Sequence, residues 1–301
     1  MNTTYTRREF SKQIALGAGA AAVPGLRAAE RRLKIGYTAL TWGVSPGRSG
    51  VLERMDQALK DMAALGYWGF EAFSLVLAEL DEKGELRGAI DKYKIPLNAG
   101  YFYCAPNSTD STPQKAKLSD VIREGRVVKK YGGTFLVLQA SSIKRAGYDF
   151  KAHRADIVAN LNECALALND LGLGTGLHQH TGTAIETRDE VYAVMEAVDT
   201  KHFKFAPDLG QLQRGGSDPL KVVKDFLPIL EHMHVKDWNG TRYCPLGEGQ
   251  VDIAGVLDLI EASSQKPDLN VELDGARPLT PLEAAQVSKA YLQKLGYKFA
   301  A

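Results

Sequence analysis

The feature that most constrains the fold is a regular alternation of short apolar segments with longer amphipathic ones across residues 33–297. Segments such as LKIGYTALTW and GTFLVLQAS are typical of buried strands, and the segments between them carry apolar residues at helical spacing. Proline near the start and glycine after the end mark helix boundaries, as at Pro113 and Gly132. Strictly alternating strands and helices predict a parallel sheet covered by helices.

The pattern predicts eight strand–helix units. Strands are expected at 33–42, 69–74, 95–103, 133–141, 173–180, 202–208, 229–237 and 269–274, and helices at 51–65, 77–93, 112–131, 150–171, 188–198, 218–227, 253–263 and 281–295. Eight units in one chain of this length predict an α/β fold, a closed (β/α)8 barrel. An open doubly wound sheet is the alternative, but TALTWGVSPGRSG after the first strand lacks the G-x-G-x-x-G spacing that it would favour.

The first thirty residues have a different character. Arg7 and Arg8 precede Phe10, and an apolar run rich in alanine and glycine follows over 14–24. A short apolar region behind a basic one is typical of a secretory signal and is too short to span a bilayer. The paired arginines resemble a twin-arginine export signal. We therefore expect a signal peptide at 1–30 and a periplasmic or otherwise exported catalytic domain at 31–301; a frayed amphipathic helix is the alternative for 1–30.

The bulk composition excludes several classes of partner. The chain is 45% hydrophobic and 24% charged, as in an ordinary globular protein. Its net charge of +1 gives no strong field to attract nucleic acid, or a membrane once the signal is cleaved. Cys104, Cys164 and Cys244 are scattered and predict neither a disulfide framework nor a zinc ribbon. We expect a small-molecule partner, and a homo-oligomer is compatible with this sequence.

Polar groups gather where the predicted strands end. In such a barrel the loops after the strands carry the chemistry. The groups at these ends are Glu71, Gln139, His178, His180, Asp208, His234, Lys236, Glu272 and Asp274. Because side chains alternate along a strand, the pattern places His178 with His180, His232 with His234 and Lys236, and His202 with Lys204 and Asp208 toward the barrel interior. Polar groups buried there must be paired or bound to a ligand.

An aspartate, a glutamate and two histidines converging from four strands indicate a metal site. Imidazole together with carboxylate suits Mn, Fe, Co, Ni or Zn better than Ca or Mg. Taken singly, a strand histidine is more often a core residue, and an aspartate at a strand end often caps the next loop. The prediction therefore depends on the whole set, spaced one residue per strand over the last four strands.

The order of these motifs resembles the sugar isomerase/epimerase family with the xylose-isomerase-like barrel. The matching pieces are GFEAF, LHQHTGT, PDLGQ, HVKDW, PLGEGQVD and VELD, spread over 33–297. The resemblance implies a TIM barrel with one divalent metal ion that acts on a sugar, keto-sugar or cyclitol. Its members include ketose 3-epimerases, inosose dehydratase, 3-dehydroshikimate dehydratase and enzymes that act on 3-keto-glycosides.

Carried over by position, the resemblance implies that Mn, Co, Fe or Zn, with Mn favoured, is bound by His178, Asp208, His234 and Glu272. Two departures bear on the chemistry. Many members have glutamate where this chain has His178, and many have D-x-G-H where this chain ends in Gln211. His180 is a rival to His178 as the ligand.

The exchange of glutamate for His178 favours one reaction type within the family. A ketose 3-epimerase uses two metal-bound glutamates, one on each face of the inverted carbon, and that pair is absent here. A ligand set with less negative charge leaves the metal a stronger Lewis acid. This favours enolisation followed by loss of a β-leaving group. Glu272 or His180 is expected to take the proton next to a carbonyl, with metal stabilisation of the enediolate, and Lys236 or His180 to assist the leaving group.

Further polar and aromatic residues are candidates for substrate binding. Glu71, Gln139, Gln211 and Asp237 are expected to bind hydroxyls, although Glu71 and Asp237 could instead pair with lysine or arginine; Trp42 and Trp238 could stack on a sugar or cover the barrel mouth. Gly247-Glu248-Gly249 is interpreted as a tight loop. The competing functions are a non-catalytic sugar-binding barrel and an apurinic-site endonuclease. Six histidines and a near-neutral charge disfavour the endonuclease, which needs a larger metal cluster.

Overall fold

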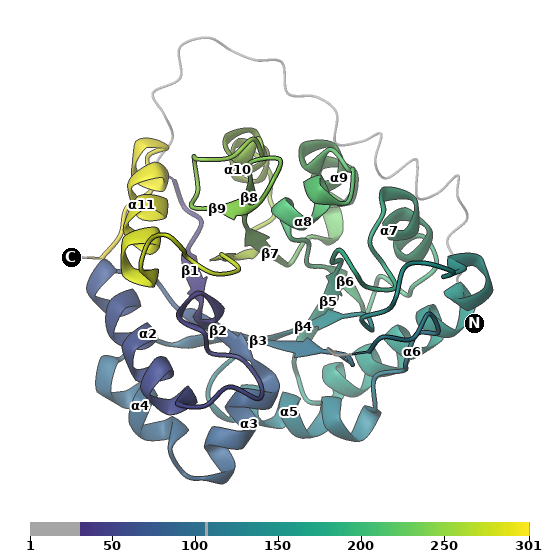
Figure 1. Ribbon diagram of the computed structural model, residues 1–301, viewed down its shortest axis with the longest axis horizontal. Coiled ribbons are helices and arrows are strands. Elements are labelled where there is room, and N and C mark those ends of the chain that lie inside the picture. The colour runs from purple at the N-terminus through teal and green to yellow at the C-terminus, as the bar shows by residue number, and fades with distance from the viewer. Residues whose placement is uncertain (1–30, 106–107, 301) are drawn as a thin grey trace.

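The computed structural model describes residues 31–105 and 108–300, in which eight parallel strands form a barrel inside a ring of helices (Figure 1). The predicted signal peptide at 1–30 lies outside the described residues. The strands run in the order β6-β5-β4-β3-β2-β1-β10-β7. They are β1 (Ile35–Thr38), β2 (Phe70–Phe73), β3 (Leu97–Tyr103), β4 (Phe135–Gln139), β5 (Gly174–His178), β6 (Lys204–Phe205), β7 (His232–Val235) and β10 (Asp268–Val271).

The two edge strands, β6 and β7, close the barrel. Isolated parallel bridges join Phe205 to Leu230 and Asp208 to His234, and the His234 amide donates to the Pro207 carbonyl at 2.8 Å. Strand β6 is short because Pro207 has no amide hydrogen to continue the ladder. The predicted (β/α)8 barrel is confirmed, and closure places Asp208 beside His234.

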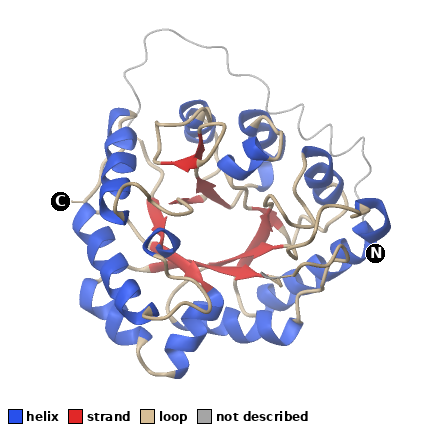
Figure 2. Cartoon of the chain, in the orientation of Figure 1, coloured by secondary structure: helices blue, strands red, loops and turns tan. Residues whose placement is uncertain are grey.

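Helices cover the outside of the barrel (Figure 2). They are α2 (Val51–Leu65), α3 (Ser74–Glu82), α4 (Leu86–Tyr93), α5 (Leu118–Lys130), α6 (Phe150–Asp170), α7 (Arg188–Met195), α8 (Leu209–Arg214), α9 (Pro219–Phe226), α10 (Ile253–Glu261) and α11 (Pro281–Lys294), with 3-10 turns η1 (Ala39–Trp42) and η2 (Leu227–Ile229). Helix α11 begins with a capping box between Thr280 and Glu283, with Pro281 in its first turn.

Two predicted helices differ from the observed ones. The helix expected at 77–93 is interrupted between α3 and α4 at Gly84, whose φ of 73° is incompatible with a right-handed helix. The helix expected at 112–131 begins only at Leu118. Asn160 of α6 binds both the amide and the carbonyl of Ala116, at 2.8 and 3.1 Å, so that this backbone is used by a side chain instead of a helical ladder.

The loops after β6 and β7 contain elements that the sequence pattern did not predict. Asp208 caps the short helix α8 by accepting the Gln211 amide at 2.8 Å. The chain after β7 forms a hairpin of β8 (Asp237–Trp238) and β9 (Tyr243–Cys244). These two elements form one side of the barrel mouth.

Apolar packing follows the predicted alternation. Phe203, Phe205, Met233 and Val235 are fully buried in the large cluster between the strands and the helices. One prediction is wrong: His202 lies in the turn before β6, where its Nδ1 is 2.8 Å from Asn169 Oδ1 of α6, and not in the barrel interior. The turn places it outside the strand, so the alternation does not extend to it.

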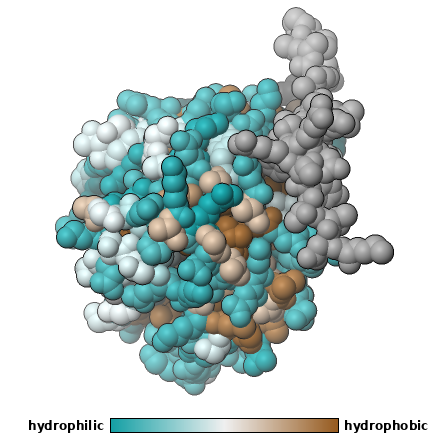
Figure 3. Space-filling model, turned by 90° about the vertical axis from the view of Figure 1, so that its right-hand side faces the viewer, coloured by the Kyte–Doolittle hydropathy of each residue, from teal (hydrophilic) through white to brown (hydrophobic). Residues whose placement is uncertain are grey.

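The surface view in Figure 3 is mostly hydrophilic, with small apolar areas separated by polar side chains. Leu166 is the large apolar side chain that is exposed, at 52% of its area, in the part of the chain that the structure describes. In that same part, no helix combines the length and the apolar character needed to cross a bilayer.

Candidate active site

Three of the four predicted metal ligands come together where β5, β6 and β7 end. The potential ligand atoms of His178, Asp208 and His234 all lie within 4.8 Å of one another, and the three side chains are buried. Glu272, directly after β10, joins them through its Oε2, which is 3.0 Å from His234 Nδ1. The structure therefore brings all four residues to the carboxyl-terminal mouth of the barrel.

His178 has no protein partner for its ring. Both of its nitrogens are buried and neither makes a hydrogen bond among the described residues. Burial and the neighbouring charge of His234 lower the pKa of His178 well below its usual value, so the ring is neutral and carries a free lone pair. An unsatisfied buried imidazole is costly, and coordination of a cation would satisfy it.

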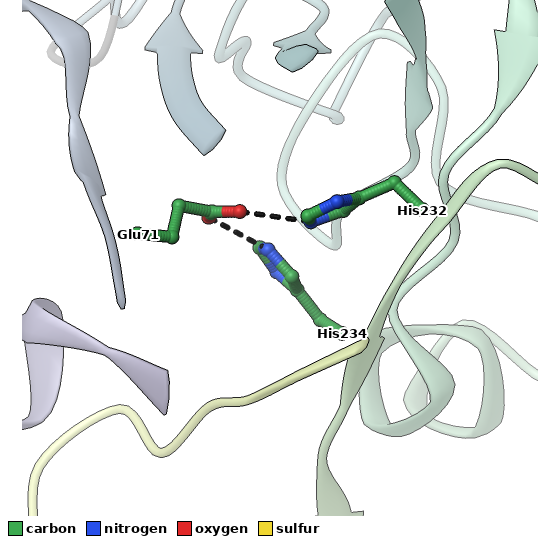
Figure 4. Close-up of side chains that lie close together, drawn as sticks. All are labelled: Glu71, His232 and His234. Atoms are coloured by element: carbon green, nitrogen blue, oxygen red, sulfur yellow. Dashed lines mark hydrogen bonds and ion pairs between the residues drawn. The ribbon is translucent and has the colours of Figure 1, made fainter. Parts of the chain in front are cut away.

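Glu71 of β2 binds two histidines of β7 at once (Figure 4). Its Oε1 is 2.7 Å from His234 Nε2, and its Oε2 is 2.8 Å from His232 Nε2. Burial alone would raise the pKa of Glu71, but the charge of His234 and the hydrogen bonds from both rings lower it to about 2. Glu71 is thus an anionic acceptor that holds the proton of each ring on Nε2.

This arrangement determines which nitrogen of His234 faces the metal ligands. With its Nε2 proton donated to Glu71, a neutral His234 has its lone pair on Nδ1, directed at the Glu272 carboxylate. The lone pair of His234 Nδ1 and those of Glu272 Oε2 would repel each other at 3.0 Å unless a cation lay between the two atoms. Either a proton, giving an imidazolium, or a metal ion meets that need.

A fully buried lysine is surrounded by acidic side chains. Lys236 Nζ lies 2.9 Å from Asp208 Oδ2 and 3.1 Å from Asp274 Oδ2, and it also contacts Glu272 Oε1. Burial alone would lower the pKa of Lys236, but the three carboxylates raise it well above its usual value. These three carboxylates surround one ammonium group, and Glu71 adds a fourth carboxylate on the far side of His234. The carboxylates outnumber the cationic groups, an excess of negative charge that favours a divalent cation.

The residues present therefore fit a divalent metal ion. They offer two imidazoles, one of them the buried His178 ring without a hydrogen-bond partner, and two carboxylates, while Glu71 orients His234 from behind.

His180 is held differently from His178. Its Nδ1 is 2.7 Å from the Thr181 carbonyl, which can only accept, so the proton lies on Nδ1. Its Nε2 is 2.7 Å from Gln211 Nε2 and accepts from that amide, while Gln211 Oε1 accepts from the Thr181 hydroxyl at 2.8 Å. Gln211, expected to bind substrate, is thus fully buried and positions His180. Of the two histidines, His178 is the one with ring nitrogens free for a metal.

A cavity of about 320 Å³ lies at the barrel mouth above these groups. Its polar lining includes Glu272, Asp274, His180 and Gln139, and its aromatic lining consists of Phe73, Tyr101 and Tyr103. Phe73 and Tyr103 are stacked, with ring centroids 6.0 Å apart. Among the described residues that line this cavity, none is lysine or arginine.

Comparison with known proteins identifies the family. The sequence matches the family of xylose isomerase-like TIM barrels over residues 59–295. The chain belongs to this family. It is 21% identical over 296 residues to inosose dehydratase of Clostridium botulinum (strain Alaska E43 / Type E3), covering 87% of this chain and 97% of the relative.

Two solved structures superpose on this one over most of its length. Apo 3-keto-D-glucoside 4-epimerase YcjR from E. coli has a TM-score of 0.66 at 17% identity, with 88% of this chain and 99% of the other covered. A xylose isomerase-like barrel from Mycobacterium smegmatis in complex with magnesium has a TM-score of 0.68 at 18% identity, covering 88% and 97%. The resemblance expected from the sequence is confirmed at the level of family and fold.

The two tryptophans lie at the edge of this xylose isomerase-like barrel, outside the cavity. Trp42 is buried, and its Nε1 donates to Asp61 Oδ2 of α2 at 2.8 Å, which anchors η1. Trp238 packs on Tyr243 within the β8–β9 hairpin, with ring centroids 5.0 Å apart.

Gln139, also expected to bind substrate, does reach the cavity. Its Oε1 accepts from the Tyr101 hydroxyl, and its Nε2 has no partner among the described residues.

Some site residues were placed by the sequence pattern without a specific role. Tyr101 and Tyr103 alternate at the end of β3, and Asp274 follows Glu272 by two positions, so alternation does place each pair on one face. His232 was expected inside the barrel but not as a partner of Glu71. These contacts join distant parts of the chain, which local spacing does not reveal.

Asp237, expected to bind a hydroxyl, instead organises the loop after β7. Its Oδ2 accepts the amides of Gly247 and Gly249, both at 2.9 Å, and its Oδ1 accepts that of Val251 at 3.1 Å. A side chain at Gly249 would collide with the Asp237 carboxylate. The tight-loop interpretation of 247–249 agrees with this geometry.

Substitution Asp237→Ala is expected to lower the free energy of unfolding by about 3 kcal/mol, because the buried Val251 amide and the partly buried amides of Gly247 and Gly249 lose a charged acceptor. Chemical denaturation measures this loss. The matched control is Asp252→Ala, which removes one cap bond to the Gly255 amide (2.9 Å) at the start of α10 and should cost about 1 kcal/mol. If Asp237→Ala kept the stability of the wild type but had a raised KM, Asp237 would instead be assigned to substrate binding.

Proposed function

We propose that this chain is a divalent-metal-dependent isomerase, epimerase or lyase that acts on a sugar, keto-sugar or cyclitol. The observation that carries the proposal is the gathering of His178, Asp208 and His234 within 4.8 Å, with Glu272 linking them to the cavity. The similarity to an inosose dehydratase and to a 3-keto-D-glucoside 4-epimerase supports a carbohydrate substrate.

The metal would be held by His178, Asp208, His234 and Glu272, with manganese proposed ahead of cobalt, iron and zinc. When bound, such an ion polarises a carbonyl and makes the neighbouring C–H bond more acidic. Glu71 keeps His234 in the tautomer that offers Nδ1 to this site.

The cavity suits one uncharged ring. Its volume, about 320 Å³, is at the small end of ligand pockets. The stacked Phe73 and Tyr103 offer a flat apolar wall for the C–H face of a sugar, and Gln139 Nε2 is free to donate to a hydroxyl. Because the described lining contains no lysine or arginine, nothing there would neutralise a phosphate on the reacting ring.

His180 is the proposed base. Its proton is fixed on Nδ1 by the Thr181 carbonyl, so Nε2 offers a lone pair at the cavity wall once substrate displaces the Gln211 amide. Glu272 is less suited, since Lys236 and His234 engage both of its oxygens. The proton moves from the carbon beside the carbonyl to His180 Nε2. In an elimination the departing oxygen takes that proton back from His180 Nε2, and Lys236 holds Asp274, which lines the cavity, in position beside the leaving group.

Metal analysis of the purified mature protein, beside its Asp208→Ala and Asp208→Asn variants, tests the proposal. We expect about one equivalent of a divalent metal in the wild type and a large loss in both variants, because each removes a carboxylate ligand. NMR in D2O with a panel of keto-sugars should then show deuterium entering beside the carbonyl. No metal in the wild type, even after reconstitution, would overturn the proposal and favour a barrel that binds sugar without transforming it.

A further inference from the structure

A second hollow of about 900 Å³ opens beside the barrel mouth, and four arginines line it. It lies between η1, the β8–β9 hairpin and the segment after β10, and its arginines are Arg54, Arg214, Arg242 and Arg277. We call it the arginine groove. Asp274 is the acidic residue among the described residues that line it, and Lys236 already binds Asp274.

The guanidinium groups of the arginine groove keep most of their donors free of protein partners. Arg242 Nη1 donates to the Arg277 carbonyl at 3.0 Å, and Arg54 Nε to the Ser49 carbonyl at 3.4 Å. Arg214 Nη1 donates to the Tyr243 hydroxyl at 3.4 Å. These bonds are to neutral acceptors, and within the described residues none of the four arginines forms an ion pair with a carboxylate. Each guanidinium has five N–H donors, so several in each remain for a ligand.

Aromatic rings complete the groove wall. Arg214 lies over the rings of Trp238 and Tyr243, at 5.2 and 5.5 Å from their centroids. The stacked guanidinium is held in place with its edge available, a geometry that suits planar anions. The two rings also offer apolar surface of the kind on which a sugar packs.

The groove adjoins the proposed active site at one residue. Asp274 lines both the groove and the inner cavity. Tyr243 lines the groove, and the Nζ of Lys236, which contacts Asp208 and Glu272, lies 4.8 Å from the centroid of its ring. A ligand with one ring in the inner cavity could therefore extend directly into the groove.

We propose that the arginine groove binds a sugar residue carrying an anionic oxygen group, a carboxylate or a sulfate, linked to the sugar that reacts in the inner cavity. Arginine forks match such groups through paired hydrogen bonds. The two hollows divide the recognition: the inner one takes an uncharged ring, and the groove takes the acidic neighbour. This inference rests on the proposed function for the identity of the reacting ring.

Calorimetric titration with matched disaccharides tests the proposal without turnover. The probes are cellobiose, its glucuronosyl-glucose counterpart and a cellobiose sulfated on the non-reducing ring. We expect at least one acidic probe to bind about tenfold or more tightly than cellobiose, with the advantage shrinking at high salt. The relative affinities of the two acidic probes distinguish a carboxylate from a sulfate site.

Variants Arg214→Gln and Arg277→Gln should each remove most of that advantage while leaving cellobiose affinity and metal content unchanged. Arg126→Gln, on α5 outside the groove, is the matched control and should retain it. Equal binding of all three probes, no binding of any probe, or a preference for acid that survives both groove variants would overturn the inference. Failure of metal binding with the acid preference intact would overturn the proposed function alone.

Discussion

Replacing His180 with alanine is expected to slow deuterium exchange beside the carbonyl of a keto-sugar substrate by about 10²–10⁴-fold while leaving metal content unchanged. The loss is that of a positioned general base. The metal is retained because the His180 nitrogens are already engaged by Thr181 and Gln211, whereas those of His178 are free. Exchange is followed by NMR in D2O, and metal content by elemental analysis.

Two further measurements separate the roles of the histidines. Added imidazole should restore part of the exchange in His180→Ala, because it can occupy the vacated space and take the proton. His178→Ala should instead lose the metal, with no rescue of exchange by imidazole. Loss of metal in His180→Ala would identify His180 as a ligand and contradict the assignment made from the geometry.

Substitution Glu71→Gln is expected to weaken the binding of Mn²⁺ by about 10–100-fold. The amide replaces one carboxylate oxygen by a donor, so one of the two Nε2–H groups from His232 and His234 loses its acceptor. A His234 that moves its proton to Nδ1 can no longer offer that nitrogen to a metal. Titration followed by the EPR signal of free Mn²⁺ gives the affinity, and the visible spectrum of the Co²⁺ form reports the ligand geometry.

The matched control for Glu71→Gln is Glu124→Gln. Glu124 is also buried, but its carboxylate accepts from the Ser74 hydroxyl at 2.6 Å and contacts neither histidine. We expect this variant to keep the Mn²⁺ affinity and the Co²⁺ spectrum of the wild type. Unchanged metal affinity in Glu71→Gln, with a raised KM, would support the direct hydroxyl contact that the sequence pattern suggested for Glu71.

Much of the fold follows from the sequence because its signals are local. The period of apolar residues and the positions of glycine and proline lie within each segment, so the helix at Val51–Leu65 and the eight-strand barrel were predictable. The late start of α5 was not, because it depends on Asn160, more than forty residues away, binding the backbone of Ala116.

In the candidate site, too, the features set by local sequence were predictable and those set by distant contacts were not. Alternation placed His178, Asp208, His234 and Glu272 at strand ends, and parallel strands of a barrel bring such ends together. The partners of acidic side chains were less predictable. Glu71 and Asp237 have the residue type of hydroxyl ligands, but one binds histidines and the other binds loop amides. A carboxylate accepts equally from either kind of donor, so its type alone does not identify its partner.

The closure of the barrel would give the proposed metal ligands a mechanical role. Between β6 and β7 the sheet is joined by isolated bridges instead of a continuous ladder, and one bridge pairs Asp208 with His234. An ion coordinated by both side chains would cross-link this junction. The same atoms that prepare a substrate for reaction would then hold the two ends of the sheet together, so a chain that loses its metal would lose part of its architectural integrity as well as its chemistry.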